Sequence, residues 1–89
     1  MASLSNLKTR AIISNIRKVR EYRNYTQDYL AAKLKISQNA YSKIELGYSK
    51  ITLNRLIEIA EILEVELTDL ISTGSNEAFQ LALKQKVNT

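Results

Sequence analysis

The chain of 89 residues contains no cysteine, no histidine and no proline, and only two glycines. Without cysteine there can be no disulfide, no zinc finger and no thiol chemistry. The lack of histidine removes the commonest general base and the commonest metal ligand. No apolar run approaches the roughly 18 residues of a membrane span, and the first ten residues contain no apolar export signal. We therefore expect a cytoplasmic protein that is not an enzyme and needs neither a metal nor another cofactor.

The composition is that of one globular domain with an uneven charge distribution. A length of 89 residues with 45% hydrophobic and 25% charged residues allows a single modest core. The net charge of +4 is the sum of a basic half, with ten Lys and Arg against three acids over residues 1–50, and an acidic half, with three against six over residues 51–89. The basic half can simply be solvated, or it can face a nucleic acid.

Apolar residues recur with helical spacing along the whole chain, and no segment shows the alternation of a β-strand, so we predict an all-α fold. Glycine and capping residues divide the chain into five expected helices over residues 10–23, 27–34, 38–46, 53–63 and 69–72. Thr52 and Thr68 are the expected N-caps of the last two. We expect residues 1–9 to form a mobile leader, residues 10–72 a compact five-helix domain, and residues 73–89 a tail that is either helical or mobile.

Residues 26–45 contain two short amphipathic patterns separated by a very short turn. Thr26 and Ser37 stand where the two helices would begin, and each hydroxyl can accept a hydrogen bond from an unpaired backbone N–H. The inward positions are Leu30, Ala31 and Leu34 in the first helix and Tyr41 and Ile44 in the second. The outer face of the second helix carries hydrogen-bonding side chains suited to base edges and phosphates, namely Gln38, Asn39, Ser42 and Lys43. The pattern predicts a helix-turn-helix whose ligand is double-stranded DNA.

Two charged residues occupy positions that the helical period turns inward. Arg20 follows Ile16 by four residues, and Glu45 follows Tyr41 by four. A lone buried charge costs several kcal/mol, so each residue needs a partner, and each is the best candidate for the other. We predict an Arg20–Glu45 ion pair between the first and third helices. The alternative is that Arg20 extends along the surface into solvent.

The residues also resemble a known family, the Cro and phage-repressor type (Xre-like) of bacterial helix-turn-helix regulators. The matching segments are Ile16-Arg-Lys-Val-Arg20, Tyr25-Thr-Gln-Asp-Tyr-Leu-Ala31, Ile36-Ser-Gln38, Tyr41-Ser-Lys-Ile-Glu45, Gly47 and Leu56-Ile-Glu-Ile-Ala60. The resemblance covers about residues 11–71. It implies a small DNA-binding transcriptional regulator, most often a repressor.

The resemblance also implies particular DNA contacts. Gln27 matches the family glutamine that touches a phosphate and braces the first side chain of the recognition helix, which is Gln38 here. Gln38 is expected to bind adenine in the major groove, and Asn39, Ser42 and Lys43 fall at the other groove-facing positions. The phosphate contacts would come from Thr26 and Gln27 and from the loop of Tyr48, Ser49 and Lys50. Arg20 and Glu45 match a buried ion pair of some members.

The chain departs from the family pattern at three positions. Lys35 stands where the turn usually has glycine, and Ile51 stands where the loop often ends in proline. Tyr41 replaces a smaller aliphatic residue, so we expect its ring to be partly buried, with the hydroxyl near the backbone. The competing interpretation of Tyr41 is a direct DNA contact.

Because one small recognition helix reads few base pairs, we expect a homodimer on a palindromic site. The apolar candidates for its interface are Leu67, Leu70, Ile71, Phe79 and Leu83. Two rival functions remain open at this stage. One is an antitoxin or adaptor whose main role is to bind a protein partner through residues 76–89. The other is an RNA or coactivator role, although Gln-Asn at a helix N-terminus suits a DNA major groove better.

Overall fold

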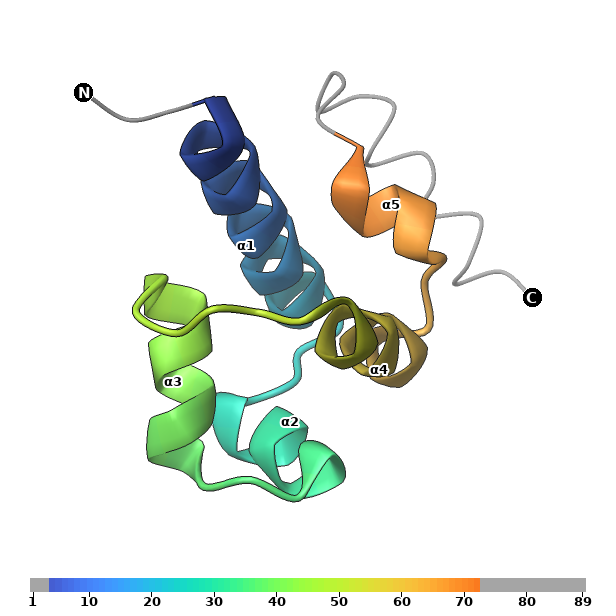
Figure 1. The fold of residues 1–89 in the computed structure, drawn as a ribbon. Coiled ribbons are helices and arrows are strands. Elements are labelled where there is room, and N and C mark those ends of the chain that lie inside the picture. Colours follow the sequence, from blue (N-terminus) through green and yellow to red (C-terminus); the bar gives the residue numbers. More distant parts are fainter. Residues whose placement is uncertain (1–3, 73–89) are drawn as a thin grey trace.

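The computed structural model describes residues 4–72, and helices are the only regular secondary structure within them. Their bounds are α1 (Leu4–Tyr22), α2 (Gln27–Leu34), α3 (Gln38–Leu46), α4 (Leu53–Leu63) and α5 (Leu67–Ile71). In Figure 1, α1 runs into the centre of the molecule, with α3 at the lower left, α2 at the bottom, and α4 and α5 at the right. The α1 helix packs against α3, α4 and α5, and α2 packs against α3 and α4. The expected all-α, five-helix fold is confirmed.

Three hydroxyl side chains start the three central helices. Thr26, Ser37 and Thr52 have extended backbones and accept hydrogen bonds from the N–H groups of Tyr29, Ala40 and Arg55, each at 3.0 Å. These caps satisfy backbone donors that the first helical turn leaves unpaired. As a result, α2, α3 and α4 begin and end at the residues predicted from the sequence.

The ends of these helices require left-handed backbone conformations. Gly47 closes α3 with φ 80°, a conformation that suits a residue without a side chain. Lys35 closes α2 with φ 60°, and Glu64 closes α4 with φ 59°. A side chain in this region costs about 1–2 kcal/mol. Asn24, just after α1, also has a positive φ of 61°, so three helix ends in residues 4–72 place a side chain in this conformation.

The first and last helices differ from the predictions. The α1 helix begins at Leu4 rather than Arg10, so residues 4–9 of the expected leader are helical. They contain no proline or glycine that would stop a helix, and residues 6–9 are exposed, so the segment gave no periodic apolar signal. The α5 helix begins at Leu67 with Glu66 as its N-cap, because the Asp69 carboxylate accepts the Glu66 N–H at 2.9 Å. The prediction of a Thr68 cap was wrong.

The core is formed by the inward faces of all five helices. Its fully buried side chains are Ile16, Val19, Leu30, Tyr41, Ile59, Leu63 and Leu70. The helical spacing in residues 53–63 predicts an inward face of Leu53, Leu56, Ile57, Ala60 and Leu63. This prediction was partly wrong, because Leu53 and Ile57 are 65% and 38% exposed while Ile59 is buried. The buried residues of α4, which are Leu56, Ile59, Ala60 and Leu63, form a single stripe that is centred differently from the predicted one, because α4 contacts α1, α2 and α5.

Two long-range side-chain contacts fasten the C-terminal helices to α1. Arg23 donates from Nε to the Leu63 carbonyl oxygen at 2.9 Å, at the end of α4. Asn15 donates from Nδ2 to the Leu70 carbonyl oxygen at 2.8 Å, in α5. Carbonyl groups at helix ends lack partners within the helix, so these side chains complete α4 and α5 while fixing their position.

Neither a membrane-spanning helix nor a metal-binding cluster is present in residues 4–72. None of the helices in residues 4–72 has the length and hydropathy needed to cross a membrane. The same residues contain no group of three or more Cys, His, Asp or Glu side chains that could hold a metal ion. The predicted tail 73–89, with the interface candidates Phe79 and Leu83, lies outside the described residues.

Candidate nucleic-acid interface

The turn between α2 and α3 has the geometry of a helix-turn-helix. Lys35 adopts the left-handed conformation, and its N–H donates to the Ala32 carbonyl oxygen at 3.1 Å. The next N–H, that of Ile36, donates to the Ala31 carbonyl oxygen at 3.0 Å, and the Ile36 side chain packs against the core. Ser37 then starts α3. Three residues are thus enough to connect α2 to α3 in a new direction and to leave one face of α3 on the surface.

The face of α3 opposite the core carries the four predicted base-reading residues. Tyr41 and Ile44 are buried, whereas Gln38, Asn39 and Lys43 are exposed and Ser42 is partly buried. Within residues 4–72, the side chains of these four polar residues have no hydrogen-bond or ion-pair partner. Their donors and acceptors are therefore available to a ligand, as recognition of base edges requires.

The predicted phosphate-contacting residues differ in their exposure and in their hydrogen-bond partners. Thr26 is exposed at the start of α2, while the Gln27 amide donates from Nε2 to Glu45 Oε1 at 3.1 Å. The backbone N–H of Tyr48 donates to the Lys43 carbonyl oxygen at 2.9 Å, so it is not available to a phosphate. Ser49 is partly buried and Lys50 is exposed. The structure thus turns Gln27 toward the interior of the domain.

Arg20 and Glu45 form the predicted ion pair beneath this surface. Arg20 donates from Nε to Glu45 Oε2 at 2.6 Å and from Nη2 to Oε1 at 3.0 Å, a two-pronged arrangement. Its Nη1 donates to the Tyr25 carbonyl oxygen at 2.9 Å. The side chains of Arg20 and Glu45 are only 11% and 3% exposed, so Arg20 does not extend into solvent. The pair ties α1 to the last turn of α3.

Tyr41 completes the network around Glu45. Its side chain is fully buried, and its hydroxyl donates to Glu45 Oε2 at 2.6 Å. The interpretation of Tyr41 as a core residue is confirmed, but the expected partial burial and backbone partner were wrong. The reason is that the Glu45 carboxylate lies one turn further along the same helix and is a stronger acceptor than a carbonyl group.

The network shifts the pKa of each titratable member. Burial by itself would raise the pKa of Glu45, but hydrogen bonds from Arg20, Tyr41 and Gln27 bring that pKa below its ordinary value. The hydrogen bond to Glu45 raises the pKa of Arg20. Burial, followed by the hydrogen bond to Glu45, raises the pKa of Tyr41. Glu45 and Arg20 are thus held in their charged forms and Tyr41 in its neutral form.

Comparison with known proteins agrees with this geometry. The family model described as helix-turn-helix matches residues 16–70. A protein of Bacillus subtilis (strain 168), whose name is "uncharacterized HTH-type transcriptional regulator YqaE", is 39% identical over 75 residues. That match takes in 83% of this chain and 65% of the relative, so the chain spans less than two thirds of the relative's length. No solved structure matches the chain. With the turn, the caps and the buried ion pair in place, this chain belongs to the helix-turn-helix family of the Cro and phage-repressor (Xre-like) type.

Proposed function

We propose that this protein binds double-stranded DNA at specific sequences and acts as a small transcriptional repressor. The observation that carries the proposal is the row of polar side chains without partners in residues 4–72, exposed at Gln38, Asn39 and Lys43, on a helix α3 whose opposite face is buried in the core. The name of the Bacillus subtilis relative, a transcriptional regulator, supports the same function. The basic N-terminal half provides the attraction to a polyanion.

Base recognition would come from the first turns of α3 in the major groove. Gln38 and Asn39 can each form two hydrogen bonds with adenine N6 and N7, and Lys43 can reach guanine O6 and N7. Ser42 can serve a base or a phosphate. Each good two-bond contact is worth about 1–3 kcal/mol of discrimination against the wrong base.

Affinity for any sequence would come from contacts with the sugar-phosphate backbone. The start of α2 lies near the last turn of α3, where Gln27 bonds to Glu45, and the loop with Ser49 and Lys50 follows that same end of α3. Tyr48 of this loop can contribute only through its side chain, because its N–H is engaged. Gln27 can reach a phosphate with the second N–H of its amide while the first stays on Glu45.

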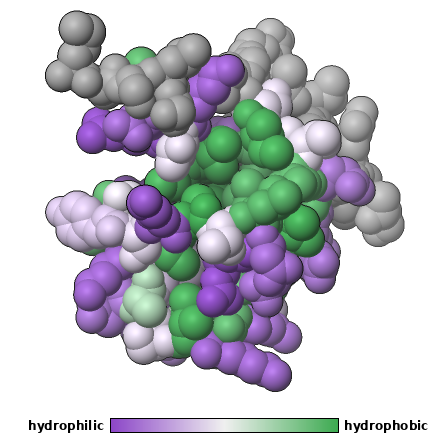
Figure 2. All heavy atoms as spheres, in the orientation of Figure 1, coloured by the Kyte–Doolittle hydropathy of each residue, from purple (hydrophilic) through white to green (hydrophobic). Residues whose placement is uncertain are grey.

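A homodimer would place two recognition helices about 34 Å apart, one turn of DNA. Leu70 cannot serve the interface, since it is fully buried in the core, whereas Ile71 is 43% exposed. Ile57 and Leu53 of α4 add exposed apolar surface, and Figure 2 shows hydrophobic residues gathered on the face over α1, α4 and α5. This face is our proposed dimer surface. Sedimentation of Ile57→Asp beside the unmodified protein tests it, and an unchanged dimer mass would contradict the assignment.

The test of the main proposal is selection of binders from a random double-stranded DNA pool, followed by affinity measurements across a salt series. We expect a palindromic site that is bound at least about 10³-fold more tightly than random DNA. Gln38→Ala should remove base preference at one position per half-site. Lys50→Ala should weaken all sequences alike and reduce the salt slope by about one. The two variants are controls for each other, because Gln38→Ala should leave the salt slope unchanged and Lys50→Ala should leave the base preference unchanged.

Two outcomes would contradict the proposal. If no sequence emerges and only a steep salt dependence remains, the helix-turn-helix is a non-specific anchor. If the selected site, placed in a promoter, gives more transcript when the protein is added, the regulator is an activator and not a repressor.

A further inference from the structure

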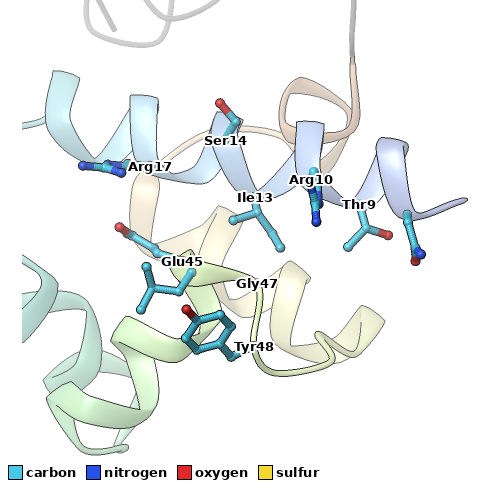
Figure 3. Close-up of a pocket in the computed structure, with 10 residues that line it drawn as sticks. Thr9, Arg10, Ile13, Ser14, Arg17, Glu45, Gly47 and Tyr48 are labelled. Atoms are coloured by element: carbon cyan, nitrogen blue, oxygen red, sulfur yellow. The ribbon is translucent and has the colours of Figure 1, made fainter. Parts of the chain in front are cut away.

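A groove of about 620 Å³ separates the N-terminal half of α1 from the end of α3 and the loop that follows. Figure 3 shows Arg10 and Ile13 directed from α1 toward the segment that carries Gly47 and Tyr48, whereas Ser14 points away from it. The α1 wall of the groove begins well before residue 16, where the family match starts. One wall of the groove is therefore built largely by a part of α1 that lies outside the family match, and the other wall by residues 45–48 within it.

The groove is positively charged. Arg10 makes no hydrogen bond or ion pair within residues 4–72. Arg17 contacts Glu21 at 3.7 Å, but both side chains are more than half exposed, so the pair is weak. The acidic residue that lines the groove is Glu45, and its charge is balanced by Arg20. Because Arg10 and Arg17 are seven residues apart, they lie on one side of α1, about 10 Å from each other.

The groove also offers apolar surface that the domain itself does not cover. Leu46 is 59% exposed and Tyr48 is 78% exposed. Ile13 lies at the bottom, with its side chain 3.9 Å from where a Cβ would stand on Gly47. Leucine and tyrosine beside two arginines make a combination typical of protein-protein contacts, in which aromatic and arginine side chains contribute most of the affinity.

We propose that this groove is a docking site for an acidic segment of a partner protein. An apolar side chain of that segment would pack on Leu46 and Tyr48, and two of its carboxylates would pair with Arg10 and Arg17. A helical segment meets this requirement when its carboxylates are seven residues apart. A DNA backbone would also satisfy the arginines, but phosphates gain nothing from the exposed leucine. The proposal goes beyond DNA recognition and does not depend on it.

The test uses fluorescence anisotropy of a labelled helical peptide with glutamates at positions i and i+7 and leucines between them. The whole 89-residue protein should bind it saturably at about 0.15 M salt, where distant charges are screened. Arg10→Glu combined with Arg17→Glu should weaken binding by about tenfold or more. The matched control is Lys8→Glu combined with Lys18→Glu, which makes the same charge change at exposed positions of α1 outside the groove.

Two further comparisons complete the test. A peptide with lysines in place of the glutamates should bind the Arg10/Arg17 variant more tightly than the unmodified protein. Leu46→Ser should weaken binding of the glutamate peptide. The circular dichroism of this variant should show an intact fold, because the Leu46 side chain is exposed. The proposal is overturned if the unmodified protein does not bind the glutamate peptide or if the Lys8/Lys18 control loses as much affinity. It is equally overturned if the Arg10/Arg17 variant binds the peptide normally but loses affinity for random DNA, since the arginines of the groove would then bind the DNA backbone.

Discussion

Replacing Arg20 by methionine keeps the length of the side chain but removes the positive charge that faces Glu45. The Glu45 carboxylate would lose two of its four hydrogen bonds and stay where its side chain is only 3% exposed. Breaking a buried pair on one side costs about 3–5 kcal/mol, because the remaining charge is neither solvated nor paired. Small domains have a total stability of about 5–15 kcal/mol, so Arg20→Met should bring this one close to unfolding.

Urea denaturation followed by circular dichroism measures this loss, with the free energy of unfolding extrapolated linearly to water. The matched control is Arg17→Met on the same helix. The Arg17 contact with Glu21 is exposed and 3.7 Å long, so its removal should cost less than about 1 kcal/mol. If Arg20→Met lowers the free energy of unfolding no more than Arg17→Met does, the Glu45 carboxylate is solvated in a way that the structure does not show, and the reasoning fails.

Three further predictions concern the same helices. The lowered pKa of Glu45 stabilises the fold above the ordinary glutamate pKa of about 4.3, and this contribution is lost as the pH falls through the folded-state value. The difference in unfolding free energy between the unmodified protein and Glu45→Gln should therefore shrink in acid, and a constant difference across the pH range would contradict this. Lys35→Gly should raise stability by about 1 kcal/mol by relieving the backbone at φ 60°, whereas Lys35→Ala should not; equal melting temperatures of the two would speak against strain. Tyr41→Phe keeps the ring but removes its bond to Glu45, so urea denaturation should show a loss of about 1.5–3 kcal/mol, and no loss would mean that the hydroxyl contributes nothing.

The parts of the fold that the sequence predicted correctly are those determined within a few residues or by a single helical face. Thr26 and Ser37 cap helices because their hydroxyl groups reach N–H groups only three residues away. Arg20 and Glu45 could be paired because helical periodicity turned both charges inward and a buried charge needs a partner. Neither inference required knowledge of how the helices pack together.

The errors at α4 and Gln27 depended on tertiary contacts, whereas the missed cap of α5 is a contact between residues three apart. Leu53 and Ile57 match the helical period of α4 as well as the buried residues do, but α4 lies among three helices and its buried face is set by all of them. The carboxylate cap of α5 was missed because Thr68 offers the more familiar hydroxyl cap. The inward turn of Gln27 had no signal in its own segment, since its partner is 18 residues away.

The Gln27 contact shows how the core is coupled to the surface that we propose for DNA. Gln27 is the first residue of α2, and Glu45 lies in the last turn of α3. Their hydrogen bond therefore joins the ends of α2 and α3 that the short turn does not connect. The turn of Lys35, Ile36 and Ser37 fixes one end covalently, and the Glu45 network fixes the other. A change in the angle between α2 and α3 would therefore break bonds to a buried carboxylate, which costs far more than moving an exposed loop. The rigidity of this pair of helices comes from the interior, and the exposed side chains of α3 remain available for a ligand.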